Sequence, residues 1–135
     1  MQILGIMDNS QHVPGAVTAV VTTYEPDLQT LEAQFVRLAG QIDALLVIDN
    51  GSANAAKVAQ LVSQFSFAQF CGVGENRGLG WAHNEGLRRA LAEGADAVLL
   101  LDQDSLPSEN MVAALRQALL QQRERGVRTA AVGAR

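Results

Sequence analysis

Apolar residues along this chain form short runs that alternate with amphipathic segments. In each run, aliphatic and β-branched side chains occupy both parities, which is typical of a strand covered on both faces. The five predicted strands span residues 16–22, 44–48, 67–73, 97–101 and 127–132.

Four segments between these runs carry apolar residues at helical spacing. The predicted helices begin near Pro26, Asn54, Leu79 and Ser108, and Gly40, Gly94 and Gly126 follow three of them. We expect Ser108 to cap the last helix, because serine side chains accept hydrogen bonds from first-turn amides. Gly86 lies inside the third helix, where glycine is destabilising unless another group approaches closely.

The alternation of strands and helices predicts the α/β fold class: a Rossmann-like, mainly parallel sheet with helices on both faces. Residues 1–15 are assigned to a leader, a candidate flexible segment that ends in Pro14-Gly15, and residues 16–135 to one domain. Ligands of such sheets bind beyond the carboxyl ends of the strands, so functional residues are expected there.

The amino-acid composition and net charge argue against some classes of function. The chain has 135 residues, of which 48% are apolar and 18% charged, with a net charge of −4. This mild acidity argues against a nucleic-acid-binding surface. The only cysteine, Cys71, cannot form an internal disulfide, and its apolar surroundings favour a buried thiol. No apolar stretch reaches membrane-spanning length, so a cytoplasmic location is expected, with peripheral association at the inner face of the membrane left open.

Polar residues follow each of the first four predicted strands. The four segments are Thr22-Thr23-Tyr24-Glu25-Pro26, Asp49-Asn50-Gly51-Ser52, Glu75-Asn76-Arg77-Gly78 and Asp102-Gln103-Asp104-Ser105. Because parallel strands end at the same edge of a sheet, these segments should converge on one site.

Asp102 and Asp104 are the most informative pair. In an extended backbone, residues two apart point to the same side, so both carboxylates would face one point and Gln103 would turn away. Neighbouring carboxylates repel unless they share a proton or a cation, and Mg²⁺ or Mn²⁺ often bridges them to substrate phosphates. The pair is a predicted metal site, and a simple turn is the alternative.

Other strand-end residues suit a nucleotide. Tyr24 could lie against a flat base, with Thr22 hydrogen-bonding to it, and Arg77 could clamp a phosphate. Alternatively, Tyr24 is a packing residue and Arg77 an exposed loop arginine. Asp49-Asn50 could contact a base or ribose, or belong only to a turn.

Together the four segments resemble the family 2 inverting glycosyltransferases, which have a GT-A fold; the resemblance covers residues 16 to about 134. Their detailed forms are most similar to the branch that uses dTDP-rhamnose. The resemblance implies the N-terminal nucleotide-binding half of a rhamnosyltransferase. Its donor would be dTDP-rhamnose or a UDP-sugar, its acceptor a carbohydrate or lipid-linked hydroxyl, and its cofactor Mg²⁺ or Mn²⁺.

The resemblance also implies roles for individual residues. Thr22 and Tyr24 would line the base pocket, Asp49 and Asn50 would hold the base or ribose, and Arg77 would contact the nucleotide or its phosphates. Asp102 and Asp104 would match the family's D-x-D motif, with Asp104 as the direct metal ligand on the diphosphate.

The family's catalytic base and acceptor segment follow the fifth strand, and no residue up to Arg135 is a convincing base. We therefore expect donor binding without efficient transfer, and a catalytically incomplete nucleotide-sugar-binding module is the alternative function.

Two other classes of α/β protein are alternatives to a glycosyltransferase. A HAD-type phosphatase has its D-x-D motif after the first strand and a later lysine, whereas Lys57, the only lysine, precedes the motif here. A receiver-like signalling domain needs an acidic pair where this chain has Thr22-Thr23-Tyr24. An exposed fifth strand that pairs with a second copy would make the protein a homo-oligomer.

Overall fold

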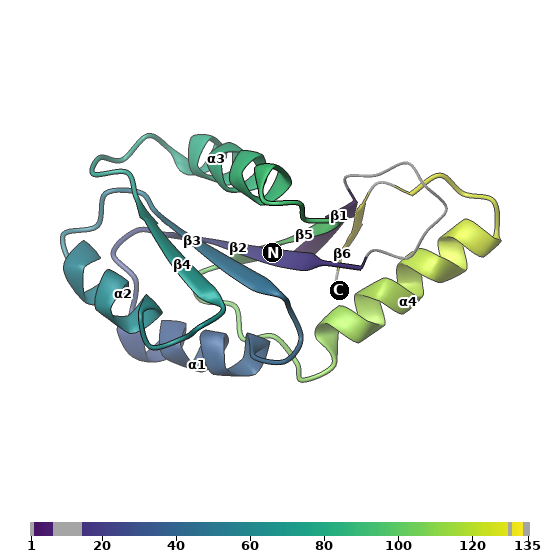
Figure 1. Cartoon of the computed structure of the whole chain (residues 1–135), viewed down its shortest axis with the longest axis horizontal. Coiled ribbons are helices and arrows are strands. Elements are labelled where there is room, and N and C mark those ends of the chain that lie inside the picture. The colour runs from purple at the N-terminus through teal and green to yellow at the C-terminus, as the bar shows by residue number, and fades with distance from the viewer. Residues whose placement is uncertain (1, 7–14, 130, 134–135) are drawn as a thin grey trace.

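A computed structural model of the chain describes residues 2–6, 15–129 and 131–133, which form six strands and four helices (Figure 1). The strands are β1 (Gln2–Ile6), β2 (Val17–Thr23), β3 (Ala44–Asp49), β4 (Ala68–Gly72), β5 (Ala97–Asp102) and β6 (Ala131–Gly133). The helices are α1 (Leu28–Leu38), α2 (Ala55–Val62), α3 (Leu79–Ala92) and α4 (Met111–Glu124).

The strands form one sheet in the order β4-β3-β2-β5-β1-β6. The first four of these pair in parallel, whereas β1 runs antiparallel to both β5 and β6. The sheet is thus mainly parallel, and the predicted α/β class is confirmed. None of the described helices is both long and apolar enough to cross a bilayer.

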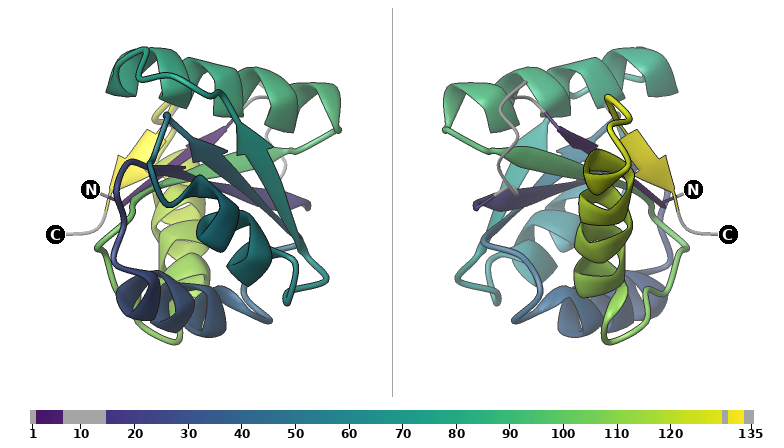
Figure 2. Two further views of the ribbon diagram at one scale, coloured as in Figure 1. Left: turned by 90° about the vertical axis from the view of Figure 1, so that its left-hand side faces the viewer. Right: turned by 90° about the vertical axis from the view of Figure 1, so that its right-hand side faces the viewer.

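Helices cover both faces of the sheet. Among the described helices, α3 alone lies over one face, and α1, α2 and α4 lie over the other (Figures 1 and 2). Successive residues of one strand serve opposite faces: Val20 packs in the cluster under α3, and Val21 packs in the larger cluster with α1, α2 and α4. This two-sided burial explains why apolar residues occupy both parities of the strand.

The first four predicted strands match β2 to β5 to within one residue at each end. The fifth begins later than predicted, at Ala131 rather than residue 127. Residues 2–6, assigned to the leader from sequence, form β1. The rest of this predicted leader, residue 1 and residues 7–14, lies outside the described residues.

Ser108 does not cap α4, so that prediction was wrong. The helix begins three residues later, at Met111, and the Ser108 hydroxyl lies 3.2 Å from the Asn110 side-chain oxygen. Gln41, beyond the end of α1, instead accepts a hydrogen bond from the first-turn amide of Val112 and donates one to the Ser108 carbonyl. Because this cap comes from a residue distant in sequence, local sequence patterns could not reveal it.

Gly86 is the point where α3 lies closest to the sheet. A Cβ atom at this position would lie 2.3 Å from Cγ1 of Val20 and 3.3 Å from Cγ1 of Ile48. Both side chains belong to the buried cluster on that face. The close approach anticipated from sequence is therefore a contact between helix and sheet.

Replacing Gly86 with alanine should destabilise the protein despite alanine's greater helix propensity. Overpacking a core typically costs about 1–3 kcal/mol, whereas the propensity gain is about 1 kcal/mol. Because the contact with Val20 is so close, the overpacking cost should lie in the upper part of this range. We therefore expect a net loss of about 1–2 kcal/mol in the free energy of unfolding, measured by urea denaturation. Gly80→Ala is the matched control, because a Cβ there meets nothing within 4 Å. An unchanged or greater stability of Gly86→Ala would contradict the close approach.

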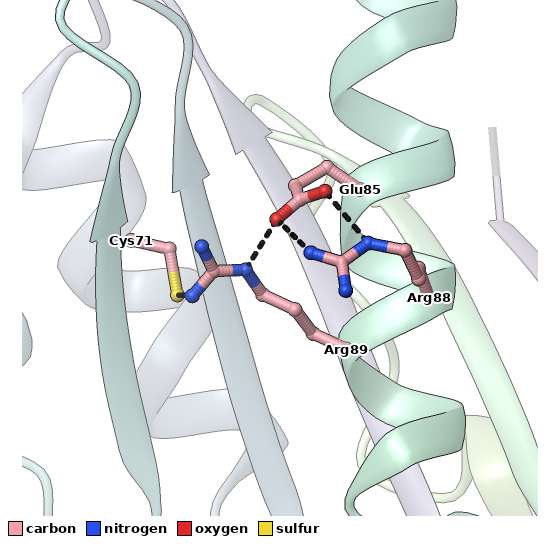
Figure 3. A network of polar contacts seen from close by, with 4 residues as sticks. All are labelled: Cys71, Glu85, Arg88 and Arg89. Atoms are coloured by element: carbon pink, nitrogen blue, oxygen red, sulfur yellow. Dashed lines mark hydrogen bonds and ion pairs between the residues drawn. The ribbon is translucent and has the colours of Figure 1, made fainter.

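A polar network joins α3 to the edge strand β4 (Figure 3). The Glu85 carboxylate accepts hydrogen bonds from Arg88 and Arg89, each with a shortest distance of 2.7 Å. These hydrogen bonds lower the pKa of Glu85 from 4.5 to about 2.

Arg89 also contacts the Cys71 sulfur at 3.3 Å. Burial raises the pKa of the Cys71 thiol, which keeps it protonated at neutral pH, and its buried position agrees with the sequence-based interpretation.

The Glu85 network should give stability a defined pH dependence. Because the pKa of Glu85 is lower in the folded protein, its contribution is complete above about pH 4.5 and is lost as the pH falls towards 2. Both arginines are substantially exposed, so we expect about 1 kcal/mol or less between wild type and Glu85→Gln at pH 7. Urea denaturation from pH 7 to pH 3 should show this difference shrinking. The exposed Glu32→Gln is the control, and a difference that grew on acidification would reject the assignment.

Candidate nucleotide site

A cleft of about 320 Å³ opens at the edge of the sheet where the parallel strands end. Its described lining residues are Thr22, Tyr24, Asn50, Asn76, Leu79, Asp102 and Gln103. They come from the ends of β2, β3 and β5, from the segment between β4 and α3, and from the first residue of α3. The predicted convergence of the four strand-end segments is therefore observed.

The cleft lies at a topological switch point. From β2 the chain continues to β3 and β4 on one side, whereas β5 pairs with the opposite side of β2. In this register Thr22 is directly opposite Asp102. Ligands of open α/β sheets bind where the strand order reverses in this way, so the cleft occupies the expected position.

Asp49 lies beneath the cleft and is only 1% exposed. Its carboxylate accepts hydrogen bonds from the hydroxyls of Thr23 and Ser52, at 2.8 and 2.7 Å, and from the backbone amides of Gly51 and Ser52. Asp49 is not among the described lining residues. In the structure, Asp49 therefore anchors the β3 loop.

Asn50 joins the β3 loop to the segment that follows β4. Its Oδ1 accepts a hydrogen bond from the Arg77 amide at 2.9 Å, and its Nδ2 donates to Oδ1 of Asn76 at 3.1 Å. Gly51 has a φ of +88°, and a Cβ there would lie 2.6 Å from the Glu75 carbonyl carbon. Glycine therefore allows these two loops to touch, and the wall of the cleft depends on that contact.

Thr22 and Tyr24 end β2 within the cleft. Thr22 is 7% exposed, and its hydroxyl has no hydrogen-bond partner among the described residues. Buried hydroxyls are normally paired, so an unpaired one in a ligand-sized cleft suits a polar ligand. Tyr24 is 48% exposed and offers an aromatic surface beside this hydroxyl.

The Asp102–Ser105 segment is a turn, and this corrects the assumption of an extended backbone. β5 ends at Asp102, and the Ser105 amide donates a hydrogen bond back to the Asp102 carbonyl at 3.2 Å. The turn sends Gln103 into the cleft, rather than away from it, and leaves Asp104 exposed beyond the lining. Of the predicted pair, only Asp102 lines the cleft.

Arg77 also lies outside the described lining. Its guanidinium donates to the Glu75 carboxylate at 2.8 Å and lies 4.9 Å from the centre of the Trp81 ring. Both members of the ion pair are substantially exposed. The implied phosphate contact would require this side chain to change partners.

The described residues contain no group of three or more His, Cys, Asp or Glu placed to hold a metal ion. The acidic groups near the cleft, Asp102 and Asp104, offer oxygen ligands alone, which are the ligands that Mg²⁺ and Mn²⁺ prefer. A cation bound mainly through substrate phosphates needs only one or two protein carboxylates. The donor set therefore fits such an ion.

Comparison with known proteins identifies the family. The model of the family described as "Glycosyl transferase family 2" matches residues 18–132. This chain belongs to glycosyltransferase family 2. It is also 34% identical over 89 residues to the dTDP-rhamnosyl transferase RfbF of Shigella flexneri. That match covers 66% of this chain but only 29% of the relative's length.

Family 2 membership supports the fold and the resemblance inferred from sequence, and it favours neither a HAD-type phosphatase nor a receiver-like domain. Sequence reasoning did not single out Gln103 or Gln34, which organise the Asp102–Ser105 turn, or Asn76 as a wall residue. Asn76 belongs to the third polar strand-end segment identified from sequence, and Gln103 lies between the two predicted metal ligands, Asp102 and Asp104. Gln34 gave a weak signal: a polar residue within the apolar spacing of the first helix.

Removing the Asp49 carboxylate should mainly reduce stability. Asp49→Ala leaves two buried hydroxyls and two loop amides without their acceptor, and we expect a loss of about 2–3 kcal/mol in the free energy of unfolding. Urea denaturation measures the loss. Asp96→Ala is the control, because that exposed carboxylate accepts one hydrogen bond from the Ala16 amide. Equal stabilities for the two variants would show that Asp49 is not an anchor.

Proposed function

We propose that this family 2 chain forms the donor site of a glycosyltransferase, binding a nucleoside-diphosphate sugar together with Mg²⁺ or Mn²⁺. The reaction is transfer of the sugar, with inversion, to a hydroxyl of a carbohydrate or lipid-linked acceptor. The observation that carries the proposal is the cleft between β2 and β5. It combines an unpaired buried hydroxyl at Thr22 with the Asp102 carboxylate directly opposite in the sheet.

The side of the cleft formed by β2 and β3 suits the base and ribose. The Thr22 hydroxyl, which has no partner among the described residues, is assigned to the base, and the Tyr24 ring is an exposed flat surface against which the base can lie. Asn50 lines the same wall, although its side chain already holds the neighbouring loop. Among the predicted base and ribose contacts, we therefore assign Asp49 an indirect role through its anchoring of Asn50.

The β5 side of the cleft suits the diphosphate. Asp102 lines the cleft, and the turn places Asp104 beyond it on the exposed edge. Both carboxylates are assigned to the cation, with Asp104 as the direct ligand. When bound, such a cation offsets the negative charge of the departing nucleoside diphosphate.

The donor is proposed to be dTDP-rhamnose. The strand-end segments resemble the branch that uses this donor, and the 34% identical Shigella relative is named a dTDP-rhamnosyl transferase. A UDP-sugar is the competing donor, because no described contact reads the base.

A catalytically incomplete nucleotide-sugar-binding module is the second candidate function. The lining residues assigned in this proposal all serve the donor, and none of them is assigned as the catalytic base. Donor binding is common to both candidates, whereas turnover with an acceptor would distinguish them.

Calorimetric titration with dTDP and UDP, each with and without Mn²⁺, tests the proposal. We expect wild type to bind dTDP more tightly than UDP, and to bind it at least about 10-fold more tightly with Mn²⁺. A tenfold change corresponds to about 1.4 kcal/mol. Asp102→Asn/Asp104→Asn should lose this enhancement, because neutral amides are poorer ligands for a divalent cation.

The control is Glu32→Gln/Glu124→Gln, which removes two exposed negative charges on α1 and α4. It should bind as wild type does. Metal-independent binding by wild type would reject the assigned cation site. No binding of either nucleotide by the folded protein would reject the donor site itself.

A further inference from the structure

Gln103 makes a reciprocal pair of hydrogen bonds with the backbone of Tyr24. Its Oε1 accepts from the Tyr24 amide at 2.8 Å, and its Nε2 donates to the Tyr24 carbonyl at 3.1 Å. Tyr24 follows β2, and Gln103 follows β5. One side chain therefore joins the two loops that follow the neighbouring strands β2 and β5 and line the same cleft.

This pairing continues the sheet beyond its last backbone contact. The register of β2 and β5 ends at Thr22 opposite Asp102, after which the β5 backbone enters the turn. A primary amide carries one acceptor and one donor group, as a peptide unit does. The Gln103 side chain thus takes the place of the next peptide group of β5 in pairing with β2. The β5 backbone itself can then turn away, which places Asp104 on the exposed edge.

A second glutamine holds the same turn from the core. Gln34 of α1 is fully buried, and its Nε2 donates to the carbonyls of Asp102 and Ser105, both at 2.7 Å. Within the described part of the chain, its side chain forms no hydrogen bond to the Tyr24 loop. Gln34 therefore secures only the turn, whereas Gln103 secures the turn and the β2 loop relative to one another.

We propose that Gln103 is a positioning residue for nucleotide binding. Its amide holds Tyr24 and the Asp102–Ser105 turn in one arrangement, so that the base side and the diphosphate side of the cleft engage a single ligand. This inference rests on the proposed donor site, because it assigns Tyr24 to the base and the turn to the diphosphate. A residue needed only for folding would hold the same loops without affecting ligand affinity.

Gln103→Met is the decisive variant, because methionine keeps the length and neutral charge of glutamine but cannot form the two hydrogen bonds. Gln34→Met is the comparison for the turn alone. Gln117→Met is the control, since Gln117 is exposed on α4. The thermal midpoint of each variant is measured first, so that binding is compared at a temperature where all four proteins are folded.

Two measurements are made on each protein. Amide hydrogen exchange in the ligand-free state should be about 10-fold faster at Tyr24 in Gln103→Met and unchanged there in Gln34→Met and Gln117→Met. Calorimetry with Mn²⁺ and dTDP should show about 10-fold weaker binding by Gln103→Met and wild-type affinity for Gln117→Met. UDP replaces dTDP if wild type prefers it.

Faster exchange at Tyr24 with unchanged nucleotide affinity would overturn the proposal and make Gln103 a structural residue only. Unchanged exchange at Tyr24 would overturn it as well, because the amide would not be holding the loop. If wild type bound neither nucleotide, the proposed donor site would fail first and this inference with it. The wild-type titration alone separates failure of the donor site from failure of the role proposed for Gln103.

Discussion

The central strand β2 fixes the geometry on which the site depends. It pairs in parallel with β3 on one side and β5 on the other, and these two registers bring Thr23 opposite Asp49 and Thr22 opposite Asp102. A shift of one residue in either register would turn buried apolar side chains to the opposite face, where they would meet different helices. Packing of both faces therefore also determines which polar residues meet at the end of β2.

The polar groups at this edge are then held mainly by neutral side-chain amides. Asn50 links two loops, Gln103 links two others, and Gln34 ties the Asp102–Ser105 turn to α1. Amides can donate and accept simultaneously and do not titrate near neutral pH, so the arrangement adds no charge close to Asp102. Among the described residues at this edge, Asp49 is the one buried carboxylate, and it accepts four hydrogen bonds.

The sequence predicted the features that repeat along the chain and failed where distant residues supply a partner. Two-sided apolar runs located β2 to β5, and their parallel order located the edge where Thr22, Tyr24, Asn50 and Asp102 now line one cleft. The capping of α4 by Gln41 was missed because that contact joins residues 71 apart in sequence.

The D-x-D motif shows the same division between local pattern and tertiary contact. The sequence pattern predicted that the motif follows the strand β5, but it did not predict that the motif's backbone forms a turn. An extended backbone would have turned Gln103 away from the cleft, but hydrogen bonds to Gln34 and Tyr24 accompany a turn instead. The shape of the motif therefore depends on two groups outside it, the Gln34 side chain and the Tyr24 backbone.

Arg77 lies outside the described lining of the cleft, and its side chain has partners that an anionic ligand could replace. Its guanidinium is paired with Glu75 and lies over Trp81, but both members of the ion pair are exposed to water. Exposed ion pairs contribute about 0–1 kcal/mol, so exchanging the Glu75 carboxylate for a phosphate costs little. The Arg77 amide, in contrast, is fixed by Asn50. The backbone thus stays anchored at the cleft wall while the charged end is free to exchange one anion for another.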